Sequence, residues 1–266
     1  MAQPLLLTDM LFSQGFGTRR ICAGLVEQGW VEVDEGNGMR AVTDTHARLL
    51  VQEGMTFQVQ GVLWQYYAKA YVMLHKPVGH ECSHKPSAWP SVYSLLPTPL
   101  RQRPARTGLQ GVQAVGRLDQ DTTGLLLLSD DGAFIHRMTS PKHHVPKVYE
   151  LTTADALDAK VVSRLLAGVV LHDDPRPVRA AACTLTGSHT MQLTLTEGKY
   201  HQVKRMLAAV GNRVVALHRS RMGHMDLPSD LPRGVISTHR LSEATTSSAS
   251  NSRPLCSFTP LRMSMV

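Results

Sequence analysis

Four aspartates bracket a run of four leucines in the stretch GRLDQDTTGLLLLSDDG, which spans residues 116–132. Asp119 and Asp121 come before the leucines, and Asp130 and Asp131 come after them. Carboxylates at such spacings can hold a metal ion, cleave a glycosidic bond or cap turns, and they can also simply be solvated. The stretch stands out because the chain around it is basic, with a formal net charge of +7.

A calcium site is the first alternative, because the stretch partly matches the loop pattern D-x-[DN]-x-[DN]-G-x5-E. Asp119, Asp121 and Gly124 fall at the first, third and sixth positions of that pattern. Thr123 stands at the fifth position, however, and Asp130 replaces the bidentate glutamate of the twelfth. The four leucines favour a sheet interior over a metal loop, so the sequence disfavours calcium.

Three of the four acids fit turns and caps. Asp121 begins D-T-T-G, where a short acceptor side chain bonds nearby backbone amides. Asp130 and Asp131 fit a turn and the N-cap of a helix over AFIHRM. Asp119 differs, because it lies at the head of a very apolar strand and beside Arg117, a cation that favours a charged carboxylate. We therefore take Asp119 as the candidate catalytic acid; with Asp121 it would form the carboxylate pair of a glycosidase.

The composition of the 266 residues indicates a polyanionic partner, most often nucleic acid, because the net charge is +7. The four cysteines lie far apart with no C-x-x-C pair, which disfavours a zinc ribbon or a disulfide framework and fits a reducing compartment. The N-terminus lacks the features of a signal peptide, and no apolar run approaches the roughly 18 residues of a membrane helix. We expect a cytoplasmic protein.

Periodicity and turn residues divide the chain into helices and strands. An N-terminal unit has a helix that begins after Thr18 and ends near Gly29, followed by strands over WVEVD and MTFQVQG. Later strands are expected over YVMLHK, GLLLLS, KVYELTT, MQLTLT and RVVALHRSRM. Residues 97–111, rich in proline and arginine, are expected to form an exposed loop. Strands separated by both turns and helices predict an α+β fold.

The segment HQVKRMLAAVG predicts a helix with one apolar and one basic face. Its apolar residues recur at i, i+3, i+4 and i+7, and they are Val203, Met206, Leu207 and Val210. The same periodicity turns His201, Lys204 and Arg205 away from the apolar stripe. This basic face is a candidate for contact with a substrate.

Four blocks of the chain together resemble the ribosomal RNA pseudouridine synthases. They are GRLDQDTTGLLLLSDDG, YVMLHKPVG with a following CS, SPKHHVPKVYEL, and EGKYHQVKRMLAAVGNRVVALHRSRMG. The N-terminal TRRICAGLVEQGWVEVD resembles an S4 RNA-binding domain. The order of the blocks is that of the RsuA-like branch, and the resemblance covers about residues 5–240.

The resemblance implies the domain organisation. We expect an S4-like RNA-binding domain over residues 1–64, a linker over 65–70, and a catalytic domain with a mixed, largely antiparallel sheet over 71–243. The tail over 244–266 is rich in serine and threonine, which predicts disorder. No amphipathic pairing segment stands out, so we expect a monomer.

The resemblance also implies an enzyme that isomerises a uridine to pseudouridine in ribosomal RNA after the base is flipped out of its stack. The base is detached from the ribose C1′ and rejoined through C5, so the family needs no redox cofactor and uses no metal. The last block favours small-subunit (16S) RNA, in an assembly intermediate, over large-subunit (23S) RNA. A non-catalytic ribosome-assembly factor and a glycosidase are the rival interpretations.

The resemblance assigns roles to individual residues. Asp119 matches the essential aspartate, which attacks the sugar, attacks the base or removes a ribose proton. Lys204 matches the basic partner of that aspartate, and Tyr149 matches the tyrosine that stacks on the target base. Arg117 either enters the space left by the flipped nucleotide or holds the backbone. The candidates for RNA contact share a basic side chain and are Arg19, Arg20, Arg101, Arg103, Arg106, Arg117, Lys142, His143, Lys147, Lys199, His201, Arg205, Arg219 and Arg221.

One histidine-rich segment remains. His80, Cys82 and His84 alternate, so on a strand they would share a face and could bind zinc. No fourth ligand is evident, and the segment follows an H-K-P-V-G turn. A loop near the substrate is therefore favoured over a metal site.

Overall fold

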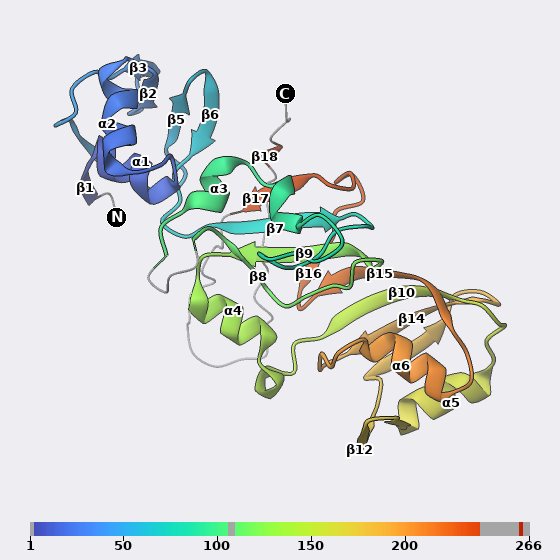
Figure 1. Cartoon of the computed structure of the whole chain (residues 1–266). Coiled ribbons are helices and arrows are strands. Elements are labelled where there is room, and N and C mark those ends of the chain that lie inside the picture. The colour runs from blue at the N-terminus through green and yellow to red at the C-terminus, as the bar shows by residue number, and fades with distance from the viewer. Residues whose placement is uncertain (1–2, 106–109, 240–260, 263–266) are drawn as a thin grey trace, which may run out of the picture.

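The computed structural model describes residues 3–105, 110–239 and 261–262. Figure 1 shows a smaller N-terminal unit, in blue, beside a larger unit built on one long sheet. The expected disordered tail falls almost entirely outside the described residues, as does Arg106. Within the described ranges, every helix is too short or too polar to cross a membrane.

The N-terminal unit has two helices and two small sheets. Its elements are β1 (Gln3–Leu6), α1 (Leu7–Gln14), α2 (Arg19–Glu27), β2 (Val31–Asp34), β3 (Met39–Ala41), β4 (Arg48–Val51), β5 (Thr56–Val59) and β6 (Val62–Gln65). Strand β1 pairs with β4, and the other strands form a sheet in the order β3-β2-β5-β6. Thr18 caps α2 by accepting a hydrogen bond from the backbone amide of Ile21, as predicted. Buried residues between Leu7 and Val59 form a hydrophobic core of their own.

The larger unit is an α+β structure around a mixed sheet. Its elements are β7 (Tyr71–Lys76), α3 (Thr98–Gln102), β8 (Gln113–Ala114), β9 (Thr123–Ser129), α4 (Gly132–Thr139), β10 (Lys147–Thr153), α5 (Ala159–Ala167), β11 (Val169–Leu171), β12 (Asp174–Val178), β13 (Ala182–Leu185), β14 (Thr190–Leu195), α6 (Gln202–Ala209), β15 (Val214–Met222), β16 (Met225–Asp226), β17 (Ile236–His239) and β18 (Leu261–Arg262), with single 3-10 turns at Val92–Leu95 and Pro141–His143. The strand order is β13-β14-β10-β15-β9-β7-β17-β18. The β9–β15 pair is parallel and the other pairs are antiparallel, so the predicted mixed, largely antiparallel sheet is confirmed.

The four leucines form the centre of this sheet. Leu126 and Leu128 pack into one hydrophobic cluster with β7, whereas Leu125 and Leu127 pack into another that includes residues of α4. All four are at most 4% exposed. An apolar run of this kind is what a strand covered on both faces requires. The strand therefore has a fixed position, and the acids at its two ends are fixed with it.

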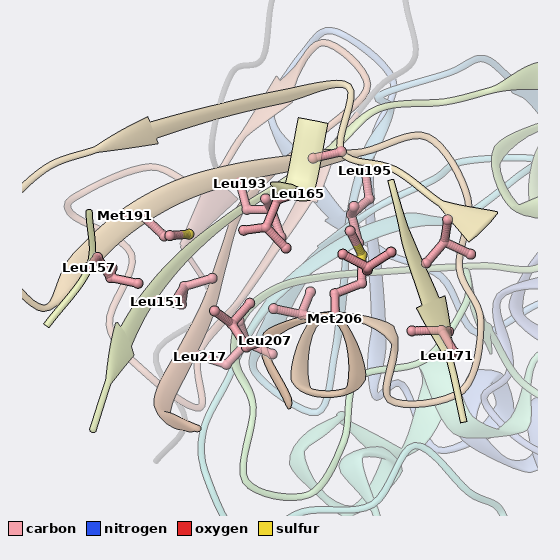
Figure 2. Close-up of a cluster of buried hydrophobic side chains, with 14 residues drawn as sticks. Leu151, Leu157, Leu165, Leu171, Met191, Leu193, Leu195, Met206, Leu207 and Leu217 are labelled. Carbon is pink, nitrogen blue, oxygen red and sulfur yellow. The ribbon is translucent and has the colours of Figure 1, made fainter. Parts of the chain in front are cut away.

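Helix α6 covers one end of the sheet, at the lower right of Figure 1. Val203, Met206 and Leu207 of the predicted apolar stripe are buried, whereas Val210 follows the helix and is partly buried. Figure 2 shows Met206 and Leu207 directed at strands that carry Leu193 and Leu217. The sequence periodicity leaves Lys204 on the outer face. Packing of this stripe therefore places the basic face of α6 toward the start of β9.

The expectation of an exposed loop over residues 97–111 was wrong for its first part. Helix α3 forms there, and Leu100 is buried. Arg103 is only 4% exposed, because its guanidinium pairs with Asp130 at 2.7 Å and also donates to the side-chain oxygen of Gln14 (2.9 Å) and the backbone carbonyl of Tyr67 (2.8 Å). These bonds join the N-terminal unit, the connection and the sheet. Arg103 is therefore structural.

Candidate active site

The candidate site lies at the start of β9, in the loop that joins β8 to β9. The backbone carbonyl of Asp119 accepts a hydrogen bond from the amide of Thr122 at 3.1 Å, which closes a turn. The Asp119 side chain is 26% exposed. It lines a pocket whose walls are Arg117, Leu118, Asp119, Thr122, Tyr149, Leu195, Glu197, Gly198, Lys199, His201, Gln202, Val203, Lys204 and Leu217.

A buried lysine holds this turn. Lys76, at the end of β7, is 0% exposed, and its ammonium donates to the backbone carbonyls of Gln120 (3.2 Å), Thr122 (2.9 Å) and Pro77 (3.0 Å). Burial lowers the pKa of Lys76, although the charges of nearby side chains oppose that shift. The three carbonyls satisfy the buried ammonium. The bonds to Gln120 and Thr122 also fix the turn that carries Asp119. The only signal of this role in the sequence is a lysine inside the apolar strand YVMLHK.

Two basic side chains approach the Asp119 carboxylate from α6 and the residue before it. The Lys204 ammonium lies 3.3 Å from Asp119 Oδ2, and His201 Nε2 lies 3.3 Å from Asp119 Oδ1. Burial lowers the pKa of Lys204, but its hydrogen bond to Asp121 and the charges of both aspartates outweigh burial and raise that pKa above its ordinary value. Lys204 is therefore a fixed positive charge beside Asp119.

Asp121 has a different role from the one we expected. We predicted that its carboxylate would bond nearby backbone amides. Instead, its two oxygens accept from the Lys204 ammonium at 2.7 and 2.9 Å. The two residues are 83 positions apart in the chain, so local turn chemistry could not indicate the pair. Asp121 holds Lys204 in place next to Asp119.

His201 reaches Asp119 through an unusual backbone conformation. Its φ is +48°, in the left-handed region that non-glycine residues seldom adopt. Its imidazole stacks on the ring of Tyr200, with ring centroids 3.7 Å apart and planes 20° apart. Backbone strain of this kind is concentrated at functional sites. We predicted His201 as an RNA contact, and the structure places it against the catalytic candidate itself.

Tyr149 and Arg117 complete the pocket. Tyr149 is half-buried in the middle of β10, where it pairs with Leu193 and Arg219 of the neighbouring strands. Tyr149 lines the pocket, and so does the exposed Arg117. The structure thus brings Asp119, Tyr149 and Lys204 together, although they are distant in the sequence.

Several other basic candidates lie elsewhere. Lys147 and Arg219 are buried in the sheet, at 8% and 2% exposure, and Arg219 donates to the Leu125 carbonyl at 2.8 Å. Burial and the charge of Arg219 lower the pKa of Lys147. Because both side chains are buried, neither is available at the surface to contact RNA. Arg205 pairs with Asp173, and Arg221 pairs with Asp226. The remaining exposed candidates are Arg19 and Arg20 on α2, Arg101 on α3, and Lys142 and His143 before β10.

The segment considered for zinc forms no ligand cluster. The Cys82 sulfur accepts from the Leu118 amide at 3.5 Å, and the His84 ring stacks on Tyr93 at 3.8 Å. His80 Nδ1 lies 3.3 Å from the backbone carbonyl of Val78. Among the described residues, no group of three His, Cys, Asp or Glu side chains is arranged to hold a metal ion. Cys82 instead supports the loop that precedes Asp119.

Comparisons with known proteins show which family the chain resembles. Residues 70–209 match the family model described as RNA pseudouridylate synthase. Ribosomal small subunit pseudouridine synthase A of Pasteurella multocida (strain Pm70) is 36% identical over 85% of this chain and 92% of its own length. The protein of the same name from Escherichia coli (strain K12) is 36% identical over 85% of this chain and 93% of its own length. A crystal structure described as a pseudouridylate synthase is 32% identical over 87% of this chain and 94% of that chain, with a TM-score of 0.59.

The family match and the named relatives, together with the mixed sheet, therefore show an RNA pseudouridine synthase, an isomerase. The chain belongs to the RNA pseudouridylate synthase family, in its RsuA-like branch.

Proposed function

We propose that this enzyme converts one uridine of small-subunit (16S) ribosomal RNA to pseudouridine, with Asp119 as the catalytic carboxylate. The observation that carries the proposal is the position of Asp119: it is partly exposed in a pocket and faces Lys204 and His201 at 3.3 Å each. The substrate is supported by the relatives named ribosomal small subunit pseudouridine synthase A, which match 85% of the chain.

The pocket residues support an isomerisation without a redox step. The C1′–N1 bond breaks, the detached uracil turns, and a C1′–C5 bond forms; the C5 proton then leaves and N1 gains a proton, so atoms and electrons balance. Asp119 either attacks the ribose, attacks the base or removes a ribose proton, and each role requires a carboxylate close to the sugar or ring. Lys204 stabilises the negative charge of Asp119, and the ring of Tyr149 offers a stacking surface for the flipped uracil.

Other parts of the chain are proposed to position the RNA. Residues 1–64 act as an S4-like RNA-binding domain, and exposed arginines on α2 and at the pocket rim contact phosphates. The proposed partner is ribosomal RNA in a small-subunit assembly intermediate, bound by a monomer. If phosphate contacts dominate, RNA affinity falls steeply as salt rises. A filter-binding titration with a flat salt dependence would contradict this part.

Tritium release tests the proposal. Small-subunit and large-subunit transcripts labelled at uridine C5 are incubated with the wild-type enzyme and with Asp119→Asn, with and without bound ribosomal proteins. Formation of the C1′–C5 bond must expel the label, so we expect release from the small-subunit RNA alone and none with the variant. Release only from large-subunit RNA would overturn the choice of substrate. Binding without release from any RNA would favour a non-catalytic assembly factor.

A further inference from the structure

Tyr200 is an exposed aromatic side chain at the edge of the site that the proposed mechanism does not use. Tyr200 is 69% exposed. Among the exposed large apolar and aromatic residues of the described ranges, it has the highest exposure. One face of its ring is covered by the His201 imidazole, at 3.7 Å between centroids and 20° between planes. The ring therefore has one supported face and one face open to solvent.

The loop that carries Tyr200 is held firmly in place. The backbone N–H of Gln202 donates to the backbone carbonyl of Lys199 at 3.2 Å, which puts Tyr200 and His201 at the centre of a turn. The buried side chain of Gln202 accepts from the Lys199 amide at 2.8 Å and donates to Glu197 at 2.9 Å. Arg205 also donates to the Tyr200 carbonyl, at 3.0 Å. The ring orientation is thus set by a braced turn and by its stacking partner.

The ring is separated from the catalytic acid by one imidazole. His201 contacts Tyr200 with its ring face and Asp119 with Nε2, at 3.3 Å. Tyr200 does not line the pocket that holds Asp119 and Tyr149, so it lies outside the space available to the target uracil. Lys199 lies in the same loop and pairs with Asp174 at 2.6 Å, and Arg205, in the first turn of α6, pairs with Asp173.

We propose that the outer face of Tyr200 stacks on the nucleobase next to the target uridine, forming a second base-binding subsite. This inference rests on the proposed function, because it takes the occupant of the Asp119 pocket to be a uridine in RNA. When one base is flipped into a pocket, its neighbour loses a stacking partner, and an exposed aromatic ring can replace that partner. A nucleobase can stack on a flat aromatic face, which an aliphatic protein surface does not offer.

The test compares Tyr200→Phe, which keeps the ring, with Tyr200→Leu, which removes it. Leu166→Ala removes an exposed apolar side chain from α5 and serves as the matched control. Affinity for a small-subunit RNA transcript is measured by filter binding with excess competitor transfer RNA. We expect Tyr200→Phe and the control to bind within about 2-fold of wild type, and Tyr200→Leu to bind about 10-fold more weakly. Wild-type affinity in Tyr200→Leu, or equal losses in both Tyr200 variants, would overturn the subsite.

Kinetics separate stacking on RNA from a purely structural role. With labelled RNA, we expect Tyr200→Leu to raise KM and to leave kcat and its pH profile within about 2-fold of wild type. If kcat or its pH profile changes while RNA affinity does not, Tyr200 only positions His201, and the subsite is wrong. If wild-type enzyme binds RNA but releases no tritium, the proposed function fails. In that case the ratio of the two Tyr200 affinities still decides whether the ring stacks on RNA.

Discussion

The two ends of β9 carry similar pairs of acids that have opposite surroundings. At the start of the strand, Asp119 is 26% exposed and Asp121 is 50% exposed, and both contact the Lys204 ammonium. At the other end, Asp130 is 10% exposed and pairs with the buried Arg103. Its neighbour Asp131 accepts from the backbone amides of Ala133 and Phe134, and so caps α4.

In the proposed mechanism, one stretch therefore holds a catalytic carboxylate at one end and structural carboxylates at the other. The oxygens of Asp130 and Asp131 are occupied by donors from the surrounding protein, including the Ala70 amide at 2.9 Å and the Tyr71 hydroxyl at 2.8 Å. Asp119 is held by longer contacts to two side chains and opens into a pocket. An acid that is fully bonded stabilises the fold, whereas one left partly open can react.

Asp119→Asn should have the largest effect on activity. The amide keeps the size of the side chain but cannot act as a nucleophile or a base, so we expect kcat to fall by at least ~10³-fold. Tritium release under single-turnover conditions measures the loss. Circular dichroism should give a Tm within a few degrees of wild type, because the side chain is partly exposed. A variant that loses activity only because it is unfolded would not support the assignment.

Asp130→Asn should have the opposite effect: it should lower stability and leave activity unchanged. The change leaves the buried Arg103 guanidinium without its counter-ion, and loss of one partner of a buried pair costs about 3 kcal/mol. Urea denaturation should therefore show a lower free energy of unfolding. The rate per folded molecule should match wild type, because β9 has 7 residues and its ends lie roughly 20 Å apart. An inactive but stable variant would contradict the contrast between the two ends.

Asp131→Ala should have a smaller effect that depends on pH. Loss of the cap of α4 should lower the free energy of unfolding by about 1 kcal/mol. Burial raises the pKa of Asp131, but hydrogen bonds from Tyr71 and two backbone amides outweigh it and lower the pKa below 3.8. The stability from this carboxylate is thus present above pH 3.8 and lost as pH falls through the lowered pKa. Unfolding curves of wild type and variant should converge in acid; a constant difference would argue against the cap.

Asp121→Asn should have the smallest effect. The Asp121 side chain that pairs with Lys204 is 50% exposed, and exposed ion pairs contribute about 1 kcal/mol or less. We therefore expect kcat to fall by no more than about 5-fold, because Lys204 keeps its contact with Asp119. Tritium release measures the change. A loss as large as that of Asp119→Asn would mean that both acids at the start of β9 take part in the chemistry.

Much of the fold could be predicted from local patterns. The leucine run indicated β9, the apolar periodicity indicated α6, and Thr18 and Asp131 were identified as caps. These features depend on residues a few positions apart. Asp119 was singled out by its position at the head of an apolar strand, but its role in the reaction and those of Tyr149 and Lys204 came from the resemblance. Their common pocket became visible only in the folded chain.

The sequence did not indicate features that depend on distant partners. Arg103 lies in a segment rich in proline and arginine, yet its buried bonds come from Gln14, Tyr67 and Asp130. Lys76 is bonded to carbonyls more than forty residues away, Gln120 and Thr122. Arginine and lysine side chains are seldom fully buried, so burial was not expected in either case. Only the three-dimensional arrangement provides the acceptors that make burial possible.

The most direct test of the account is the nucleoside content of small-subunit RNA after incubation with enzyme. Wild type, Asp119→Asn and Asp130→Asn are compared at equal concentrations of folded protein, at a temperature where all three are folded, and the RNA is digested and separated by chromatography. We predict pseudouridine, without free uracil, from wild type and Asp130→Asn, and none from Asp119→Asn. Pseudouridine formed by Asp119→Asn at the wild-type rate would contradict the central claim.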